Sequence, residues 1–274
     1  MSHSIESVID RHSEIVALEQ LCEHNSEKRI LFVEAITGYG KTALMDKFWA
    51  YIGTKNLPRA FVELSPHVID ETHILHKIAD AWGIEHFCSF RHIVESEPYY
   101  DPVLINKNVL VGWGQSKLGI QVSVNENAWN AYIRRLTEAW LEDARNIPSL
   151  DSPYFVLMDD YNSAGMDQGD GNLVSRSVER WFEMIFLPRV VRIPHLRLVV
   201  SGRKTPRIGR DIETYALRCQ LGPIHSVKDW MQFVRHIRGA ELPYEAVRAV
   251  CIVHDGHPLL LATALLLLCD SWTD

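Results

Sequence analysis

The sequence predicts an α/β fold in which a mainly parallel sheet lies between two layers of helices. Short apolar runs of strand length alternate with segments whose apolar residues recur at helical spacing, the pattern of a doubly wound sheet. A glycine-rich loop connects the first run, residues 30–33, to a helical pattern that begins at Lys41. The 274 residues suffice for one large domain and a small helical appendage.

The loop after residues 30–33 has the features of a phosphate-binding loop. The stretch 28–42 reads KRILFVEAITGYGKT. Gly38 and Gly40 let backbone N–H groups turn toward an anion without Cβ clashes, and the following helix adds the positive end of its dipole. Lys41 would reach the β- and γ-phosphates of a nucleotide, and Thr42 would place its hydroxyl on Mg²⁺.

One position departs from the strict phosphate-loop pattern, because Ala35 stands where the pattern has its leading glycine. Alanine is tolerated there in many nucleotide-binding families. The alternative is a glycine-rich turn that binds nothing, but the strand before it and the helix after it favour a phosphate site. The predicted nucleotide contacts of this loop are Thr37, Gly38, Tyr39, Gly40, Lys41, Thr42 and Ala43.

Further elements follow from apolar spacing. Before the loop, residues 13–24 form an amphipathic helix with Ser13 as its N-cap. After it we expect helices over 41–51 and 71–82 and a strand over 60–64. Residues 84–125 interrupt the α/β alternation. Within this insertion, apolar and polar residues alternate over 118–124, which predicts a β-hairpin, and a long helix over 126–144 follows.

The second half of the chain predicts buried strands over 154–158 and 196–200, a last strand over 217–221, and a helix over 174–186. From Ser226 the pattern is helical, and Ser226 with Asp229 has the spacing of a capping box. Helices over 243–254 and 258–270 complete the chain. The fold class is therefore a P-loop NTPase three-layer αβα sandwich. We assign residues 1–222 to the nucleotide-binding domain and 223–274 to a small, possibly truncated helical lid.

Two acids follow the strand over 154–158. Asp159 would hold Mg²⁺ beside Thr42, partly through water, and Asp160 would orient or deprotonate an attacking water. The alternative is two solvated acids at the start of a loop. The phosphate loop favours the metal role, because a doubly wound sheet brings both loops to its carboxyl edge.

Arg203 and Pro258 are further candidates. The strand over 196–200 continues into Ser-Gly-Arg, so Arg203 could contact the γ-phosphate and distinguish ATP from ADP. Alternatively it belongs to a basic surface cluster, and both interpretations stay open. Pro258 opens a helix after Gly256-His257 and could rest against the base or sugar of a nucleotide. The alternative there is a simple turn between two core helices.

Composition narrows the function classes. The net charge of −7 argues against nucleic acid as the principal partner. Five widely spaced cysteines without a C-x-x-C pair indicate a reducing compartment, and we expect Cys88 to be buried. The N-terminus lacks an apolar targeting segment. The most apolar run, 259–268, has about half of the ~20 residues that span a bilayer. We therefore expect a cytoplasmic protein without a membrane segment.

These motifs, in this order, resemble the STAND class of P-loop ATPases, which is related to the AAA+ ATPases and includes the NACHT and NB-ARC groups. RHSEIVALEQL resembles the helix that forms the adenine pocket, which would give Arg11 a nucleotide contact. EAITGYGKTALM resembles Walker A, VLMDD resembles Walker B, and LVVSGR resembles a sensor strand with a terminal arginine. GHPLLLATALL is similar to the G-x-P motif of the lid. The insertion looks closest to a bacterial branch of the class.

The resemblance implies a switch that hydrolyses ATP slowly with Mg²⁺, with Lys41, Asp160 and Arg203 in catalysis. ADP would hold the core closed against its lid, and ATP would open it and favour self-association in signalling or defence. Asp10 replaces the glycine that the family commonly has before the first arginine, and no winged helix or sensor repeats follow the lid. We therefore expect an ATPase core that works with partner effector or sensor domains.

Three other functions remain open. One is an initiator-type AAA+ ATPase that acts on DNA, which a basic face or a winged helix would favour. Another is a scaffold folded around permanently bound ADP, with an inert site. The third is a small-molecule kinase, whose acceptor pocket would have to lie in the insertion over 84–125.

Overall fold

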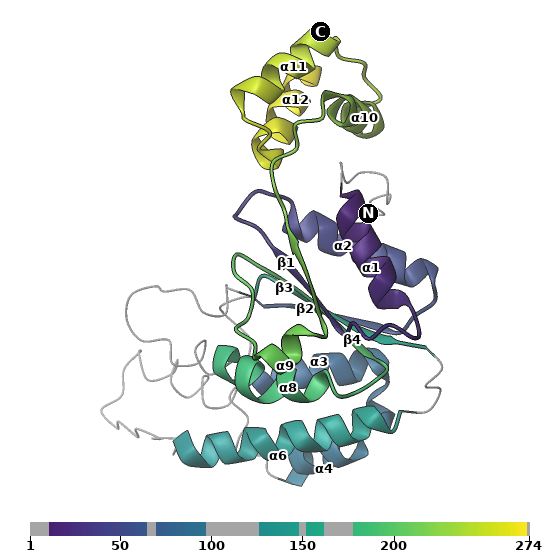
Figure 1. Cartoon of the computed structure of the whole chain (residues 1–274), viewed down its shortest axis with the longest axis vertical. Helices are drawn as coiled ribbons and strands as arrows, with labels where there is room; N and C mark the ends of the chain where they lie inside the picture. Colours follow the sequence, from purple (N-terminus) through teal and green to yellow (C-terminus); the bar gives the residue numbers. More distant parts are fainter. Residues whose placement is uncertain (1–10, 65–69, 97–125, 148–151, 162–177, 273–274) are drawn as a thin grey trace, which may run out of the picture.

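The structure is a computed structural model that describes residues 11–64, 70–96, 126–147, 152–161 and 178–272. Five strands form one sheet in the order β2-β3-β4-β1-β5, and every pairing is parallel (Figure 1). The strands are β1 (Ile30–Glu34), β2 (Arg59–Glu63), β3 (Tyr154–Asp159), β4 (Leu196–Gly202) and β5 (Ala216–Gln220). The carboxyl ends of all the strands therefore lie along the same edge of the sheet.

Helices cover both faces of the sheet, which confirms the predicted three-layer sandwich (Figure 1). One face carries α1 (His12–Cys22) and α2 (Lys41–Thr54). The other carries α3 (Glu71–Trp82), η2 (Ile84–His86), α4 (Cys88–Ser96), α6 (Glu126–Arg145), the π-helical turn η5 (Phe182–Phe186), α8 (Leu187–Val190) and α9 (Arg210–Glu213). Strand β1 shows why both layers form. Its residues Leu31 and Val33 belong to the core on the side of α1 and α2, while Ile30 and Phe32 belong to the core on the opposite face.

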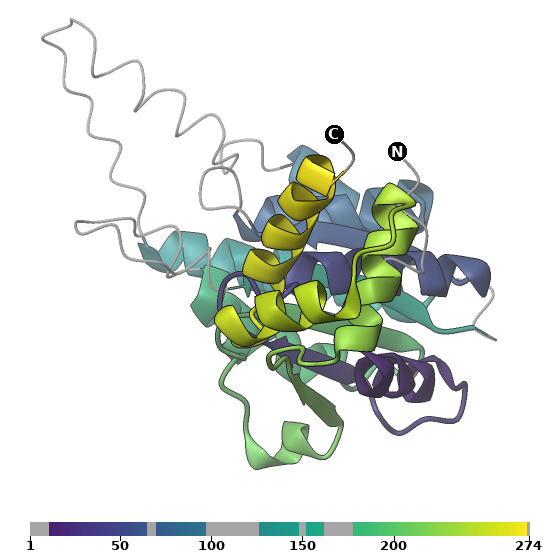
Figure 2. The same cartoon turned by 90° about the horizontal axis from the view of Figure 1, so that it is seen from above.

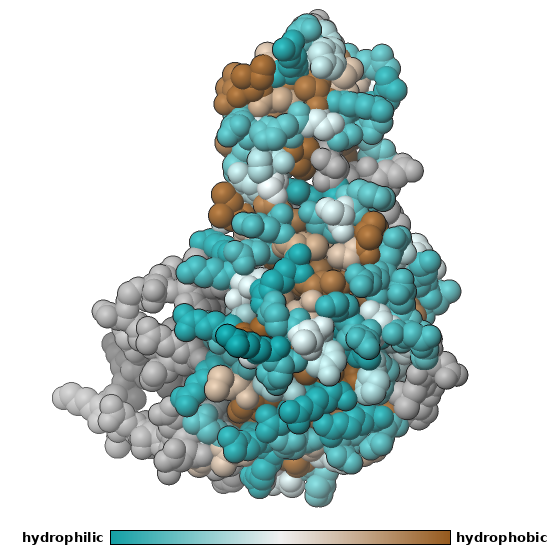
Figure 3. Space-filling model, viewed as in Figure 1, coloured by the Kyte–Doolittle hydropathy of each residue, from teal (hydrophilic) through white to brown (hydrophobic). Residues whose placement is uncertain are grey.

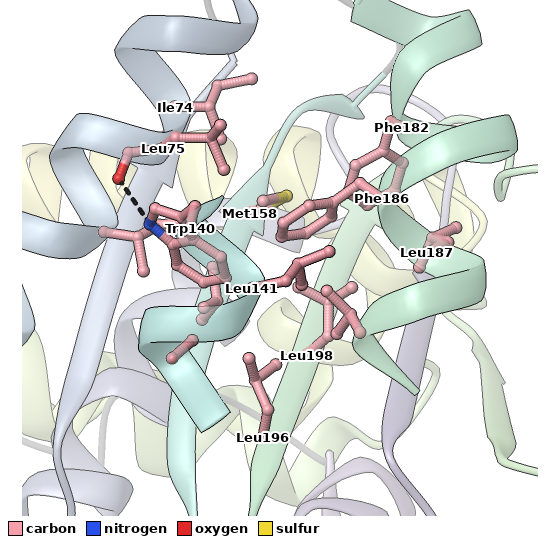
Figure 4. Close-up of a cluster of buried hydrophobic side chains, with 14 of the residues drawn as sticks. Ile74, Leu75, Trp140, Leu141, Met158, Phe182, Phe186, Leu187, Leu196 and Leu198 are labelled. Carbon is pink, nitrogen blue, oxygen red and sulfur yellow. Dashed lines mark hydrogen bonds between the residues drawn. The ribbon is translucent and has the colours of Figure 1, made fainter. Parts of the chain in front are cut away.

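The larger core centres on Trp140 of α6, which is fully buried (Figure 4). Its indole Nε1 donates a hydrogen bond of 3.1 Å to the carbonyl of Leu75 on α3, so the buried polar atom is satisfied. Nearby, Nε1 of Trp181 donates to Oγ1 of Thr137 at 2.9 Å. These two bonds fix how the outer helices are oriented over the sheet.

The C-terminal helices α10 (Val227–Arg238), α11 (Tyr244–Val253) and α12 (Pro258–Trp272) pack around a small core of their own. We call these three helices the lid. Figures 1 and 2 show that it lies beyond the sheet, joined to β5 by a single connection. The backbone N–H of Asp229 donates to Oγ of Ser226, which confirms the predicted cap of α10. The domain boundary at residue 222 stays a prediction.

Most predicted elements agree with the structure to within about two residues at their ends, but two local predictions are wrong. Ser13 does not cap α1. The helix begins at His12, Arg11 occupies the cap position, and the Ser13 hydroxyl bonds to the carboxylate of Glu14. Cys88 is exposed. The predicted hairpin over 118–124 and the start of the helix over 174–186 lie outside the described residues.

The surface is mainly hydrophilic on the face shown in Figure 3, and hydrophobic residues gather on the lid. Among the described residues, no helix is both long enough and apolar enough to cross a membrane. The lid nevertheless exposes large apolar side chains: Ile252, Val253, Leu259, Leu260 and Leu267.

Candidate functional site

The loop between β1 and α2 has the backbone of a phosphate cradle. Gly38 and Gly40 have φ angles of 86° and 83°, a region that glycine reaches without a Cβ penalty. Ala35 does not have a positive φ. It is only 4% exposed, and its N–H donates to the carbonyl of Gly202 on β4 at 3.0 Å. The conformation at this position therefore does not require glycine.

Lys41 lies at the first position of α2, and its ammonium group folds back on the loop. Nζ donates to the carbonyls of Ala35 at 2.7 Å and Ile36 at 3.1 Å. Burial lowers the pKa of Lys41, the nearby Asp160 and Asp159 partly offset this, and Arg203 lowers it further. The electrostatic neighbours of the lysine are therefore the two acids and the arginine that the sequence predicts for the site.

The acidic pair lies where β3 ends. Asp159 is 3% exposed, and its Oδ1 accepts hydrogen bonds from the Ser201 hydroxyl and from the backbone N–H of Asp160 at 3.0 Å. Asp160 has a φ of 59°, which aspartate tolerates better than most side chains. The sequence analysis missed Ser201. The signal in the sequence was a serine directly after the apolar run 198–200 and next to Gly202 and Arg203.

The donor set fits Mg²⁺ bound together with a nucleotide. The described part of the chain holds no cluster of three or more histidine, cysteine or acidic side chains that could bind a metal by itself. Mg²⁺ keeps several waters and takes one or two protein oxygens plus phosphate oxygens. Oδ1 of Asp159 already accepts two hydrogen bonds, so its second oxygen is the one suited to a metal or a metal-bound water.

Arg11 connects the loop to the start of the lid. It is 7% exposed, and its Nη2 donates at 3.1 Å both to the carbonyl of Tyr39 and to that of Gly222. Glu14 lies 3.8 Å from its Nη1. One guanidinium thus touches the phosphate loop and the link between β5 and α10.

The lid touches the loop directly. The N–H of Leu259 donates to the carbonyl of Gly38 at 3.1 Å. The rings of Tyr39 and His257 meet edge to face with centroids 4.9 Å apart. A Cβ added to Gly38 would lie 2.5 Å from Cε1 of His257. The sequence analysis identified Pro258 but missed its two neighbours, whose contacts depend on how the lid packs against the loop.

A cavity of about 600 Å³ opens between the loop and the lid. Every predicted site residue lines it: Arg11, Thr37, Gly38, Tyr39, Gly40, Lys41, Thr42, Ala43, Asp159, Asp160, Arg203 and Pro258. The lining also includes residues that the sequence analysis missed: Asp46, Lys47, Ala50, Ile224, Trp230, Phe233, Ile237, Leu259 and Ala262. Glycines, acids and cations thus line the loop side, while apolar side chains of α10 and α12 line the lid side. This division suits a ligand with a charged end and a flat, less polar end.

Glu183 links the two segments that carry Asp160 and Arg203. Its Oε1 accepts from the Tyr161 hydroxyl at 3.1 Å and from the backbone N–H of Arg207 at 2.7 Å. Burial, together with Glu183, raises the pKa of Tyr161. Glu183 lies in the π-helical turn η5, a rare element that often occurs at functional sites. The sequence alone gives no sign of this contact.

No protein-family model and no curated protein matches the sequence. Two solved structures resemble this chain with a TM-score of 0.50, each covering 97% of it. They are a DNA replication initiation factor at 9% identity and the replication initiator DnaA, bound to AMPPCP and single-stranded DNA, at 8% identity. The chain shares the P-loop αβα fold of these two structures. It spans 64% of the length of those two chains.

The contact between lid and loop predicts a specific effect of Gly38→Ala. Gly38 and Gly239 both have positive φ, so alanine at either position costs about 1–2 kcal/mol. Only at Gly38 would the methyl group also clash with the lid, because nothing lies within 4 Å of a Cβ at Gly239. We expect Gly38→Ala to reduce hydrogen-exchange protection of the Leu259 amide and Gly239→Ala to leave it unchanged. Equal protection in the two variants would contradict the contact.

Proposed function

We propose that this protein is an ATP-binding molecular switch of the STAND type that hydrolyses ATP slowly. One observation carries the proposal: a single cavity gathers the phosphate loop, the acids after β3, the arginine after β4 and the start of the last lid helix. These groups come from four separate parts of the chain. If the glycine-rich loop bound no ligand, there would be no reason for these four groups to line the same cavity.

The chemistry assigns each group a role. The loop N–H groups and Lys41 bind the β- and γ-phosphates, and the apolar lid side accommodates the base. Thr42 and Asp159 hold Mg²⁺, which neutralises charge on the phosphates. Asp160 orients the attacking water, and Arg203 contacts the γ-phosphate, which only ATP carries.

The lid contact supports a switch. The loop that binds phosphate also bonds to Leu259 and packs against His257, so the nucleotide state and the lid position act on the same backbone. ADP would favour the closed arrangement, and ATP would open it. The exposed apolar side chains of the lid would then take part in self-association or bind effector and sensor partners. These partners, a role in signalling or defence and a cytoplasmic location remain predictions.

Removal of the Lys41 ammonium tests nucleotide binding. We expect Lys41→Ala to abolish measurable ATP binding in isothermal titration calorimetry, because the phosphates lose their main cation. Lys55→Ala is the matched control, since Lys55 directly follows the same helix and lies against Tyr51 instead of the cavity. Unchanged affinity in Lys41→Ala would rule out the phosphate-loop assignment.

Asp160→Asn separates hydrolysis from binding. The amide keeps the size of the side chain but cannot take a proton from water, so we expect unchanged ATP affinity and slower phosphate release. A parent protein that releases no phosphate, and yields ADP when denatured, would instead be an inert scaffold. Equal turnover in the variant and the parent would remove Asp160 from the catalytic role.

A second candidate function is an initiator-like ATPase that acts on DNA. It is favoured by the structural likeness to replication initiators, one of which is bound to single-stranded DNA. The segment after β4 also exposes Arg203, Lys204, Arg207 and Arg210. The overall charge of −7 therefore does not exclude a local basic surface, and the expectation that nucleic acid is not a partner lacks support.

Fluorescence anisotropy with a labelled single-stranded oligonucleotide tests this candidate. If the basic segment binds DNA, affinity falls steeply with salt, and changing Lys204, Arg207 and Arg210 together to glutamine weakens it. The control changes Arg235, Arg238 and Arg248 of the lid to glutamine, which removes the same formal charge elsewhere. Equal effects of the two triple variants, or no binding at low salt, would exclude this segment as a DNA site.

A further inference from the structure

A second cavity of about 480 Å³ lies at the opposite edge of the sheet. Its lining is His24, Arg29, Arg145, Pro153, Pro194, His195 and Arg197. Each of these residues precedes or begins a strand, or lies at or just after the C-terminus of a helix. The cavity is therefore at the amino edge, away from the phosphate loop. Three guanidinium groups and two imidazoles line it, and the described lining contains no acid.

Arg197 is the most buried of these cations, at 1% exposure. Nε donates to the carbonyl of Leu21 at 2.9 Å, and Nη1 donates to that of Pro194 at 2.6 Å. Nη2 reaches only the carbonyl of Glu23, at the long distance of 3.5 Å. Within the described chain its partners are carbonyls and not carboxylates, so its positive charge is solvated but not neutralised.

Arg29 adds a second guanidinium to the same cavity. Its Nη1 donates to the carbonyls of Ser26 and Lys28, while Nε and Nη2 make no hydrogen bond in the described part of the chain. Burial and, to a smaller extent, the like charge of Arg29 lower the pKa of Arg197 to about 10. Two cations therefore repel each other across a cavity that both of them line.

Arg145 and His195 complete the arrangement. Arg145 is half-exposed and lies 3.7 Å from the carboxylate of Glu142, one helical turn away. His195 is held by a 3.0 Å contact between its Nε2 and the carbonyl of Ala144, which leaves Nδ1 for another partner. Burial and Arg197 lower the pKa of His195. An anion in the cavity would favour the charged forms of Arg197 and His195 and so raise both pKa values.

A purely structural role explains part of this cluster. Cations at helix C-termini stabilise the last carbonyls of the helix. This accounts for Arg197, which donates from β4 to the carbonyl of Leu21 near the end of α1, and for Arg145 in the last turn of α6. It does not account for Arg29, whose guanidinium group donates hydrogen bonds only to carbonyls of its own turn within the described chain. Nor does it explain why three guanidinium groups share a cavity without an acid.

We propose that this cavity binds the phosphate group of a small phosphorylated molecule. Planar guanidinium groups match tetrahedral oxyanions, and the cavity has room for more than one phosphate. The site does not depend on the proposed function, because it shares no residue with the cavity between the phosphate loop and the lid. Free phosphate and a phosphate monoester offer the same chemistry, and direct binding measurements distinguish them.

The test uses the full chain carrying Lys41→Ala, so that the phosphate loop does not compete for the probe. Orthophosphate and glycerol 3-phosphate are titrated by equilibrium dialysis at constant ionic strength. We expect saturable binding of at least one probe, weakened about tenfold or more by Arg29→Gln, since hydrogen bonds to charged groups contribute that much. Tighter binding of the monoester would mean that the rest of the cavity also contacts the ligand. Equal affinities would mean that the site recognises phosphate alone.

Arg145→Gln provides a second variant that does not depend on the buried residues, and Arg248→Gln is its matched control. Both arginines lie on helix surfaces with a glutamate three residues before them, 3.7 Å away for Arg145 and 3.5 Å away for Arg248. Weaker binding in Arg145→Gln but not in Arg248→Gln supports the site. The absence of saturable binding at millimolar concentration, or equal effects of these two substitutions, would overturn it.

Discussion

The parallel register of β1, β4 and β3 is the constraint on which the candidate site depends. Pairing of Glu34 with Gly202 and of Met158 with Val200 brings the ends of the three strands level. The phosphate loop, Ser201 with Arg203, and the acidic pair therefore emerge side by side. A shift of one residue in β3 would move Asp159 away from Ser201 and turn its side chain to the other face. The arrangement of charges thus follows from backbone hydrogen bonding.

Helix α1 extends this constraint to both edges of the sheet. At its N-terminus, Arg11 holds the carbonyls of Tyr39 and Gly222. At its C-terminus, the carbonyls of Leu21 and Glu23 are held by Arg197. An 11-residue helix is about 16 Å long, so one helix reaches from the cavity between the loop and the lid to the arginine-lined cavity at the amino edge. A ligand in either cavity would lie beside an arginine that contacts one end of this helix.

The sequence predicts those features of the structure that depend on a pattern of neighbouring residues. Apolar periodicity located the strands, and the glycine spacing located the phosphate loop, because both signals lie within a few adjacent residues. Contacts between distant segments were missed, as with Glu183 to Tyr161 or His257 to Tyr39. Ser13 was a reasonable N-cap by residue type, but long-range bonds from Arg11 set where α1 begins. Net charge does not decide whether nucleic acid is a partner, because a sum over the chain says nothing about one exposed segment.

The lid contact and the proposed phosphate binding would use different atoms of the same loop. Leu259 bonds to the carbonyl of Gly38, whereas an anion would use the loop N–H groups, so the lid can stay in place when phosphate binds. Lys41 cannot do the same, because its ammonium now donates to the carbonyls of Ala35 and Ile36 and would have to turn toward the phosphates. Occupancy alone would therefore rearrange the lysine and leave the lid closed. A difference between ATP and ADP would therefore have to reach the lid through a group that contacts the terminal phosphate. Arg203 is the best placed candidate in the cavity lining, because it follows β4. Strand β4 pairs directly with β1, the strand that leads into the loop.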